Sequence, residues 1–302
     1  MTTTEQAEYA YLQKFLYLSL ATAIATVTIK AVAAWLTNSI GLWSDAMEST
    51  INLLAALVAI WALRLSAKPA DHNHDFGHGK AEYMSAAVEG SLIFVASIAI
   101  IVSAIQRFLH PAPLEELGIG LVLSTVATLL NLGTGMALLR AGRQHRSITL
   151  EADGKHLLTD VWTSVGVLIG IALVLLTGWA FLDPAIALAV GVNILVTGYH
   201  LVRRSVVGLL DAALPPEEVE IVAAAVARAA QDPRVSVTDQ RTRESGRQRF
   251  VYVTLSVPGQ WTVRRSHDVA DAIEDEVDAA LPGTTTFVHI EPDDEPTARG
   301  AS

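Results

Sequence analysis

The chain contains no cysteine among its 302 residues. This absence excludes a disulfide framework, a thiolate metal site and a thiol nucleophile, so any metal ligands must be His, Asp and Glu side chains. Charged residues are also scarce, at 17% of the chain, whereas 51% of the residues are hydrophobic. Soluble proteins carry more charge, so these proportions favour a protein with a membrane domain. The net charge of −10 argues against nucleic acid as a partner.

Targeting and catalytic motifs are missing as well. Residues 1–14 have no basic segment and no small-residue cleavage site, so we expect no removable signal peptide. Together with the lack of a long His-rich loop, this favours a bacterial inner membrane as the location. The sequence has no nucleophile–base pair, no phosphate-binding loop and no Gly-rich dinucleotide fingerprint, which argues against an enzyme.

Six apolar runs fill the first two-thirds of the chain. Each meets or approaches the ~20 residues that a helix needs to cross a bilayer. The runs are roughly 12–36, 39–65, 83–107, 115–139, 156–179 and 182–202. Lys and Arg gather at alternate ends of the runs, for example at Lys14, Lys80 and Arg204. Basic residues favour the cytoplasmic side, so we expect both termini to be cytoplasmic in a multi-pass membrane protein.

The composition changes after about residue 208. Residues 209–302 carry 17 Asp and Glu against 9 Arg and no Lys. The local patterns there predict the order α-β-β-α-β, typical of a ferredoxin-like α+β domain. The expected elements are a helix at 215–230, strands at 235–241 and 249–257, a helix at 266–281 and a strand at 284–290. We therefore expect an all-α transmembrane transport domain of six helices at 1–208, a cytoplasmic dimerisation or regulatory domain at 209–292, and a disordered tail at 293–302.

His156 and Asp160 lie at the start of the fifth apolar run, in the stretch Glu151-Ala-Asp-Gly-Lys-His-Leu-Leu-Thr-Asp160. On a helix these two residues, four apart, share one face about 6 Å from each other. An imidazole and a carboxylate aimed at one point suit a divalent metal ion. If the helix instead began later, both groups would simply be solvated in a loop.

A second polar stretch interrupts the second apolar run. Asp45 and Ser49 are again four residues apart, and Glu48 lies between them in Ser44-Asp-Ala-Met-Glu-Ser49. An ionised carboxylate inside a membrane helix is costly and is a functional hypothesis by default. Two helices that each offer a polar pair at one-turn spacing can together build a site with four ligands.

The loop between the second and third runs, residues 71–82, concentrates three His, three acids and two Gly. His and carboxylate groups at short spacing can bind a divalent cation. A solvated polar loop near lipid headgroups is an equally good interpretation of these residues.

With these motifs, the chain resembles the cation diffusion facilitator family, the dimeric proton-coupled exporters of zinc and related metals. The resemblance extends from about residue 12 to 292. It rests on Ser-Asp45-Ala-Met-Glu-Ser49, Phe-Gly-His78-Gly-Lys80-Ala-Glu82 and His156-Leu-Leu-Thr-Asp160, which occur in the order that the family shows.

The resemblance implies a transport site at Asp45, Ser49, His156 and Asp160. Many zinc-transporting members have a carboxylate where this chain has Ser49, so the fourth ligand could be the Ser49 hydroxyl, Glu48 or water. His156 favours a borderline metal such as zinc over magnesium or calcium. The implied substrate is Zn²⁺, with Fe²⁺, Co²⁺ and Mn²⁺ as alternatives.

The resemblance also implies metal sites outside the membrane helices. A second site would be formed by Asp71, His74 and His78. In the cytoplasmic domain, the family's ligand positions match only His267, His289 and Glu291. The positions for two further His are occupied by Thr238 and Thr254. We therefore expect at most a partial metal site there, or packing alone.

The function implied is efflux of divalent cations from the cytoplasm by alternating access, in exchange for protons. The expected partners are metal cations, protons, membrane lipids and a second copy of the chain. Two other interpretations use the same residues. A metal sensor or scaffold would bind metal without transporting it, and a channel would conduct metal without proton coupling.

Overall fold

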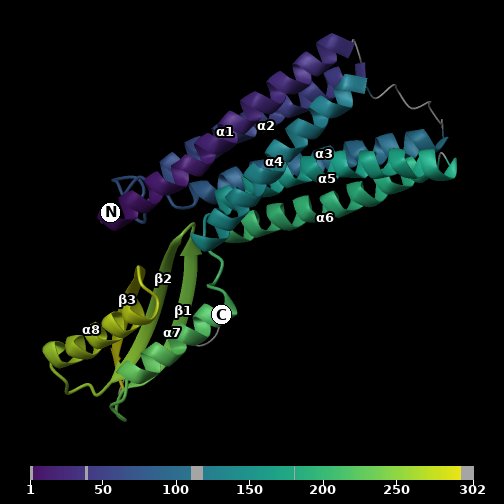
Figure 1. The fold of residues 1–302 in the computed structure, drawn as a ribbon. Helices are drawn as coiled ribbons and strands as arrows, with labels where there is room; N and C mark the ends of the chain where they lie inside the picture. Colours follow the sequence, from purple (N-terminus) through teal and green to yellow (C-terminus); the bar gives the residue numbers. More distant parts are fainter. Residues whose placement is uncertain (1–2, 38–39, 110–117, 180, 294–302) are drawn as a thin grey trace. The chain divides into compact units, whose positions relative to one another are not determined.

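Six long helices form the first part of the structure, which is a computed structural model describing residues 3–37, 40–109, 118–179 and 181–293. Along part of these helices only the backbone is described. The helices are α1 (Thr3–Thr37), α2 (Ile40–Ser66), α3 (Ala81–Leu109), α4 (Gly118–Gln144), α5 (Ile148–Thr177) and α6 (Leu182–Leu209) (Figure 1). Each of the six predicted apolar runs thus coincides with a helix over most of its described residues.

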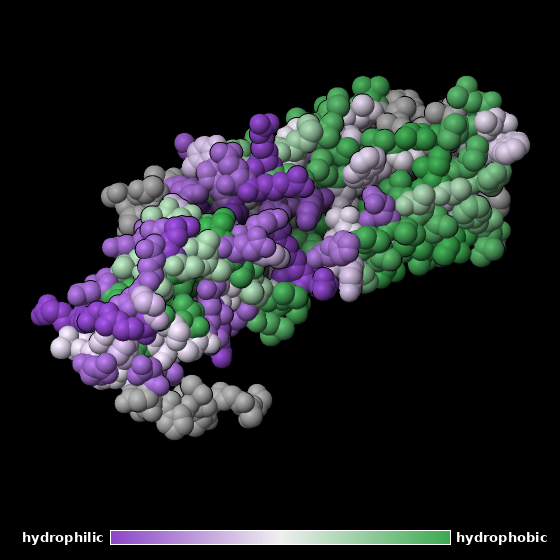
Figure 2. Space-filling view, turned by 90° about the horizontal axis from the view of Figure 1, so that it is seen from below, coloured by the Kyte–Doolittle hydropathy of each residue, from purple (hydrophilic) through white to green (hydrophobic). Residues whose placement is uncertain are grey.

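Length and hydropathy both suit a bilayer. The shortest of the six helices has 27 residues, which corresponds to about 40 Å and exceeds the ~30 Å hydrocarbon core. Within the described residues, three segments are long and apolar enough to cross a membrane: Glu8–Ala33, Ala81–Leu109 and Pro184–Leu209. Figure 2 shows hydrophobic residues over much of the helical part. Val95 of α3 and Leu129 of α4 are among the exposed hydrophobic residues of these helices, which suits contact with lipid.

The helices pack closely where glycine replaces a side chain. A Cβ atom at Gly154 of α5 would lie 2.9 Å from the backbone nitrogen of Leu139 in α4. At Gly198 of α6, a Cβ atom would lie 2.9 Å from the backbone nitrogen of Phe94 in α3. Small residues allow membrane helices to approach in this way. Inside the bundle, the hydroxyls of Thr22 and Thr134 are 2.8 Å apart and join α1 to α4.

The chain divides into two units, Met1–Val206 and Val207–Ser302, and the second is an α+β domain. Its elements are α7 (Pro216–Ala229), β1 (Ser236–Ser245), β2 (Gln248–Val257), α8 (Val263–Ala280) and β3 (Thr284–Pro292). The predicted order α-β-β-α-β is confirmed. The sheet order is β1-β2-β3, with β1 and β2 antiparallel and β2 and β3 parallel.

One face of this sheet carries the core of the second unit. Val251, Val253 and Leu255 of β2 alternate toward the helices and are buried with Val222 of α7 and Ile273 of α8. The hairpin turns at Gly246, whose φ of 61° favours glycine. The predicted disordered tail begins at residue 293, and residues 294–302 lie outside the described part of the chain.

Candidate functional site

His156 and Asp160 lie on an unbroken helix, because α5 begins at Ile148, eight residues before His156. Ser147 precedes the helix, and its hydroxyl accepts a hydrogen bond from the backbone N–H of Leu150 at 3.5 Å. Serine is a favoured residue at this position, since it satisfies an otherwise unpaired N–H group. The alternative that His156 and Asp160 occupy a solvated loop is therefore wrong.

Asn52 of α2 connects these two residues. The amide nitrogen of Asn52 donates a hydrogen bond to Asp160 Oδ2, and its amide oxygen lies 2.6 Å from His156 Nε2. Asn52 is 4% exposed and His156 is 6% exposed. A second amide, Asn131 of α4, donates to Asp160 Oδ2 at 3.4 Å. Side chains from three helices thus meet at one partly buried carboxylate.

These contacts determine which nitrogen of the His156 imidazole carries a hydrogen atom. A carboxylate oxygen only accepts, so the Asn52 nitrogen must face Asp160 and the Asn52 oxygen must face His156. His156 Nε2 therefore carries the hydrogen, and Nδ1 carries the lone pair. His156 Nδ1 is buried and has no hydrogen-bond partner among the described residues. The two nitrogens of the imidazole thus have different roles, one donating to Asn52 and one available as a ligand.

The predicted residues of α2 lie on the same helix as Asn52. Ser49 is buried at 1% exposure, one turn before Asn52. Asp45 and Glu48 belong to α2, but their side chains lie outside the described part of the chain. Asn52 was not among the site residues predicted from the sequence, although its spacing of four residues from Glu48 and seven from Asp45 places it on the same helical face. That spacing was the signal that could have identified it.

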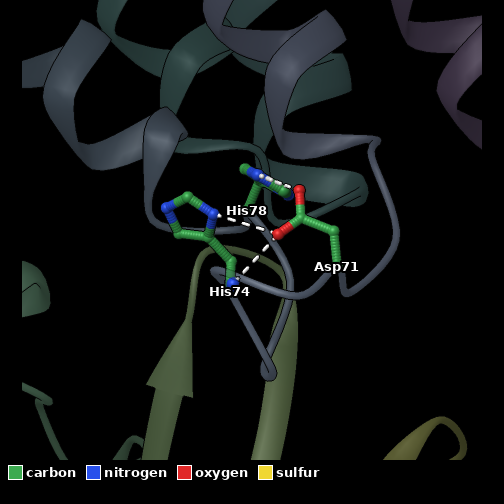
Figure 3. A group of neighbouring side chains, drawn as sticks. All are labelled: Asp71, His74 and His78. Carbon is green, nitrogen blue, oxygen red and sulfur yellow. Dashed lines mark hydrogen bonds and ion pairs between the residues drawn. The ribbon is translucent and has the colours of Figure 1, made fainter.

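The loop residues Asp71, His74 and His78 converge on one point (Figure 3). His74 Nδ1 lies 3.3 Å from Asp71 Oδ1, and His78 Nε2 lies 3.4 Å from Asp71 Oδ2. Their ligand atoms all lie within 4.8 Å of one another, which makes this the one such group of three within the described residues. His78 Nδ1 is buried, and no described residue forms a hydrogen bond with it.

Two backbone N–H groups stabilise the negative charge of the Asp71 carboxylate. The N–H groups of Asn73 and His74 donate to Asp71 Oδ1 at 2.9 and 3.0 Å. These hydrogen bonds, that from Asn73 first, lower the pKa of the Asp71 carboxyl below its usual value. A carboxylate and two imidazoles that are already close together are suitable ligands for zinc or a similar ion.

The predicted residues of the cytoplasmic domain form separate pairs. His267 of α8 lies 3.1 Å from Asp271, and His289 of β3 lies 3.4 Å from Glu291. Both imidazoles are largely exposed. Thr254 is the β2 neighbour of His289 in the sheet. Within the described part of the chain, His267, His289 and Glu291 do not form a group of three convergent ligands.

Comparisons with known proteins match both units. The model of the cation efflux transmembrane domain matches residues 16–210, and that of the cytoplasmic domain of cation efflux proteins matches residues 214–293. The uncharacterized transporter sll1263 of Synechocystis sp. is 46% identical over 279 residues, 92% of this chain and 90% of that protein. The cation-efflux pump FieF of Klebsiella pneumoniae is 30% identical over 272 residues, 90% of each chain. The solved structure of the Zn form of CzrB, 33% identical, covers 28% of this chain and 94% of that chain with a TM-score of 0.26.

Proposed function

The chain belongs to the cation efflux, or cation diffusion facilitator, family, and on that premise we propose that it exports Zn²⁺ from the cytoplasm in exchange for protons. It is a multi-pass membrane transporter with a cytoplasmic C-terminal domain, and not an enzyme. The observation that carries the proposal is the contact of the buried Asn52 side chain with both His156 and Asp160. This contact joins α2 to α5 through potential metal ligands, inside the helix bundle.

The proposed transport site consists of His156, Asp160 and Asn52, completed by a polar residue of the preceding turns of α2. The sequence predicts Asp45 and Ser49 in this role, with Glu48 or water as alternatives to Ser49. Asn52 contacts both α5 residues, so an arriving cation must either share these groups with the amide or displace it. An amide oxygen is itself a metal ligand, and the neutral imidazole of His156 favours a borderline ion.

Proton exchange follows from the chemistry of these ligands. A metal ion binds the deprotonated carboxylate and the neutral imidazole, so protons and metal compete for the same groups. Unneutralised charge is costly in the middle of a membrane, so the deprotonated carrier without metal would change conformation rarely. This penalty couples metal movement in one direction to proton movement in the other.

The metal preference is the finer part of the proposal. The FieF relatives are named cation-efflux pumps, and that name specifies no metal. The ligand chemistry of this chain therefore has to support the choice. One imidazole among oxygen ligands supports Zn²⁺, and Fe²⁺, Co²⁺ and Mn²⁺ are the alternatives for this ligand set.

We propose a second cation site at Asp71, His74 and His78, supported by their convergence. We further propose that the protein acts as a homodimer in the inner membrane. The match to the cytoplasmic domain of cation efflux proteins supports this assembly. A metal site at His267, His289 and Glu291 remains a prediction.

Flux measurements in proteoliposomes test the function. Uptake of zinc, iron, cobalt and manganese is followed with and without a pH gradient, for the wild type, Asp160→Ala and Asp271→Ala. Asp271 is an exposed carboxylate of α8 and serves as the matched control. We expect gradient-dependent flux that Asp160→Ala abolishes and Asp271→Ala preserves. Wild-type flux that ignores the gradient would indicate a channel, and metal binding without flux would indicate a sensor.

A further inference from the structure

Asn131 of α4 is a buried residue in direct contact with the proposed transport site. It is 2% exposed, and its amide nitrogen donates a hydrogen bond to Asp160 Oδ2 at 3.4 Å. Asn52 of α2 donates to the same carboxylate oxygen. Amides from two different helices therefore meet at the carboxylate of Asp160, which is a ligand of the proposed site.

Close packing of α4 against its neighbours holds Asn131 in this position. Gly135 follows Asn131 by four residues, so both lie on one face of α4. A Cβ atom at Gly135 would lie 3.1 Å from the carbonyl oxygen of Gly154 in α5, so this face packs directly on α5. The next turn is joined to α1, because the hydroxyls of Thr134 and Thr22 are 2.8 Å apart. Contacts with two helices thus fix the part of α4 that carries Asn131.

The amide oxygen of Asn131 is an unpaired acceptor. A carboxylate oxygen only accepts, so Nδ2 is the amide atom that contacts Asp160, and the lone pairs of Oδ1 are not used there. Oδ1 is buried and forms no hydrogen bond with any residue that the structure describes. The same is true of His156 Nδ1. Buried acceptors without a donor are costly, and a cation bound at Asp160 would be a partner for both.

A small rotation of the side chain would make Asn131 a metal ligand. A metal ion bound to Asp160 Oδ2 would take the place at which the Asn131 N–H group now donates, because both approach the same oxygen. The χ2 torsion of asparagine is broad and roughly two-fold, so the amide can turn and present Oδ1 instead of Nδ2. Amide oxygens bind divalent cations as carboxylate oxygens do. The same side chain would therefore donate to the carboxylate without metal and bind the metal when it is present.

We propose that Asn131 supplies an oxygen ligand from α4 to the transported cation, a role that rests on the transport site proposed above. The site then takes side chains from α2, α4 and α5. An amide oxygen is a hard ligand that adds no negative charge, and together with one imidazole it keeps the site open to Zn²⁺, Fe²⁺, Co²⁺ and Mn²⁺. Asn131 thereby helps to determine the metal specificity, and a softer ligand in its place would favour Zn²⁺ over Mn²⁺.

Asn131→Cys tests the ligand role, with Co²⁺ as the probe. The chain has no cysteine, so the variant carries a single thiol, and cysteine is no bulkier than asparagine. A thiolate bound to Co²⁺ produces a strong sulfur-to-metal charge-transfer band in the near ultraviolet, which oxygen and imidazole ligands do not produce. We expect this band in the full-length variant in detergent and oxygen-free buffer, and not in the wild type. Competition titrations should also shift toward Zn²⁺ over Mn²⁺ by about tenfold or more, the size of effect that changes around a metal have on affinity.

The controls separate the possible failures. Asn193 is an asparagine of α6 with an exposed side chain, so Asn193→Cys should give no band. Co²⁺ bound to the Asn131→Cys variant without the band would overturn the ligand role of Asn131 alone. Adding Asp160→Ala to that variant should abolish the band. A band that persists without the Asp160 carboxylate would overturn the proposed transport site, and the ligand role with it.

Asn131→Asp gives a second readout that does not depend on the cysteine variant. The substitution keeps the shape, offers an oxygen in either orientation and removes the N–H group that donates to Asp160. It is made in a His78→Ala background, which weakens the loop site, and His78→Ala alone is the reference. Calorimetric titration should show zinc binding that is about tenfold or more tighter, because a charged ligand replaces a neutral one. A residue that only orients Asp160 would lose its hydrogen bond instead, so unchanged or weaker zinc binding would also overturn the proposal.

Discussion

At the scale of single residues, the amide of Asn52 joins the two helices that carry the proposed transport site. It donates to Asp160 and accepts from His156, so it orients both groups and sets the imidazole tautomer. Loss of such a supporting contact around a metal ligand typically lowers metal affinity by about 10- to 100-fold. The same arrangement makes Asn52 a candidate ligand, because its oxygen already faces the imidazole.

Substitutions at positions 52 and 49 distinguish the two candidates on α2. We expect Asn52→Ala to weaken zinc binding at the transport site by about 10- to 100-fold, as loss of an orienting partner does in other metal sites. Ser49→Ala should have a smaller effect, and Asn52→Asp should tighten zinc binding by adding a carboxylate. Calorimetric zinc titrations of the variants measure these changes. A larger loss in Ser49→Ala than in Asn52→Ala would assign the ligand to Ser49.

Metal binding at the loop site should depend on pH. The hydrogen bond from the Asn73 N–H lowers the pKa of the Asp71 carboxyl and so favours its ionised form, and a binding metal ion displaces any protons that its ligands carry. Affinity should fall as the pH falls, by up to about tenfold per pH unit for each proton displaced. His78→Ala should weaken binding and reduce this slope. Zinc titrations between neutral and mildly acidic pH, in a variant that also carries Asp160→Ala, measure the loop site alone. A slope unchanged by His78→Ala would remove that residue from the site.

At the scale of helices, close packing holds the polar groups in place. Glycines let the backbones of neighbouring helices approach, as at Gly154 between α5 and α4. The buried polar residues of α5 then lie beside polar side chains of neighbouring helices, such as Asn52 and Asn131. Electrostatic interactions are strengthened in such an environment, and unpaired polar atoms become costly. Polar groups in the interior of the bundle can therefore bind a cation or a proton strongly.

A pair of glycine variants tests this packing. Gly198→Ala places a methyl group 2.9 Å from the backbone nitrogen of Phe94, so the helices must separate, at a cost of about 1–3 kcal/mol. Gly133→Ala in α4 is the matched control, since a Cβ atom there meets nothing within 4 Å. The higher helix propensity of alanine should make this variant as stable as the wild type or up to about 1 kcal/mol more stable. Thermal unfolding in detergent should order the melting temperatures, from high to low, as Gly133→Ala, wild type, Gly198→Ala. Equal melting temperatures for both variants would contradict the close contact.

At the scale of the whole molecule, two units of different composition have different roles. The helical unit is apolar outside and polar at its buried site, as a transporter in a bilayer requires. The C-terminal unit is acidic, and its helices pack against one face of its sheet. The rings of Tyr252 and Phe287, on neighbouring strands, stack at a centroid distance of 5.1 Å, and Phe287 is 41% exposed. Exposed aromatic residues on a sheet suit an interface with a second copy of the chain.

Phe287→Asp tests this interface. A charge at the centre of an apolar contact should weaken the proposed homodimer and shift the detergent-solubilised protein toward the monomer. Val263→Asp is a suitable control, because Val263 is 87% exposed at the start of α8 and the acid would also favour the N-terminal end of that helix. Light scattering coupled to size-exclusion chromatography measures the mass. A dimer that withstands Phe287→Asp would place the interface elsewhere.

Local patterns in the amino-acid sequence were sufficient to predict the elements of both units. Apolar runs long enough for a bilayer predicted the six helices, and the alternation after residue 208 predicted the α-β-β-α-β domain. The spacing of His156 and Asp160 placed both on one face of α5, because helical geometry alone relates residues four apart. The loop at 71–82 is likewise local, so its His and acidic residues indicated a possible cation site, and the resemblance to the family singled out Asp71, His74 and His78.

Packing between helices determines which side chains from distant parts of the chain come into contact. Local sequence patterns do not predict these contacts. Asp45, Glu48, Ser49 and Asn52 all share one face of α2, so periodicity cannot distinguish among them. Only the axial position and rotation of α2 against α5 bring Asn52 to His156 and Asp160. These contacts join helices far apart in the chain, and local spacing carries no information about them.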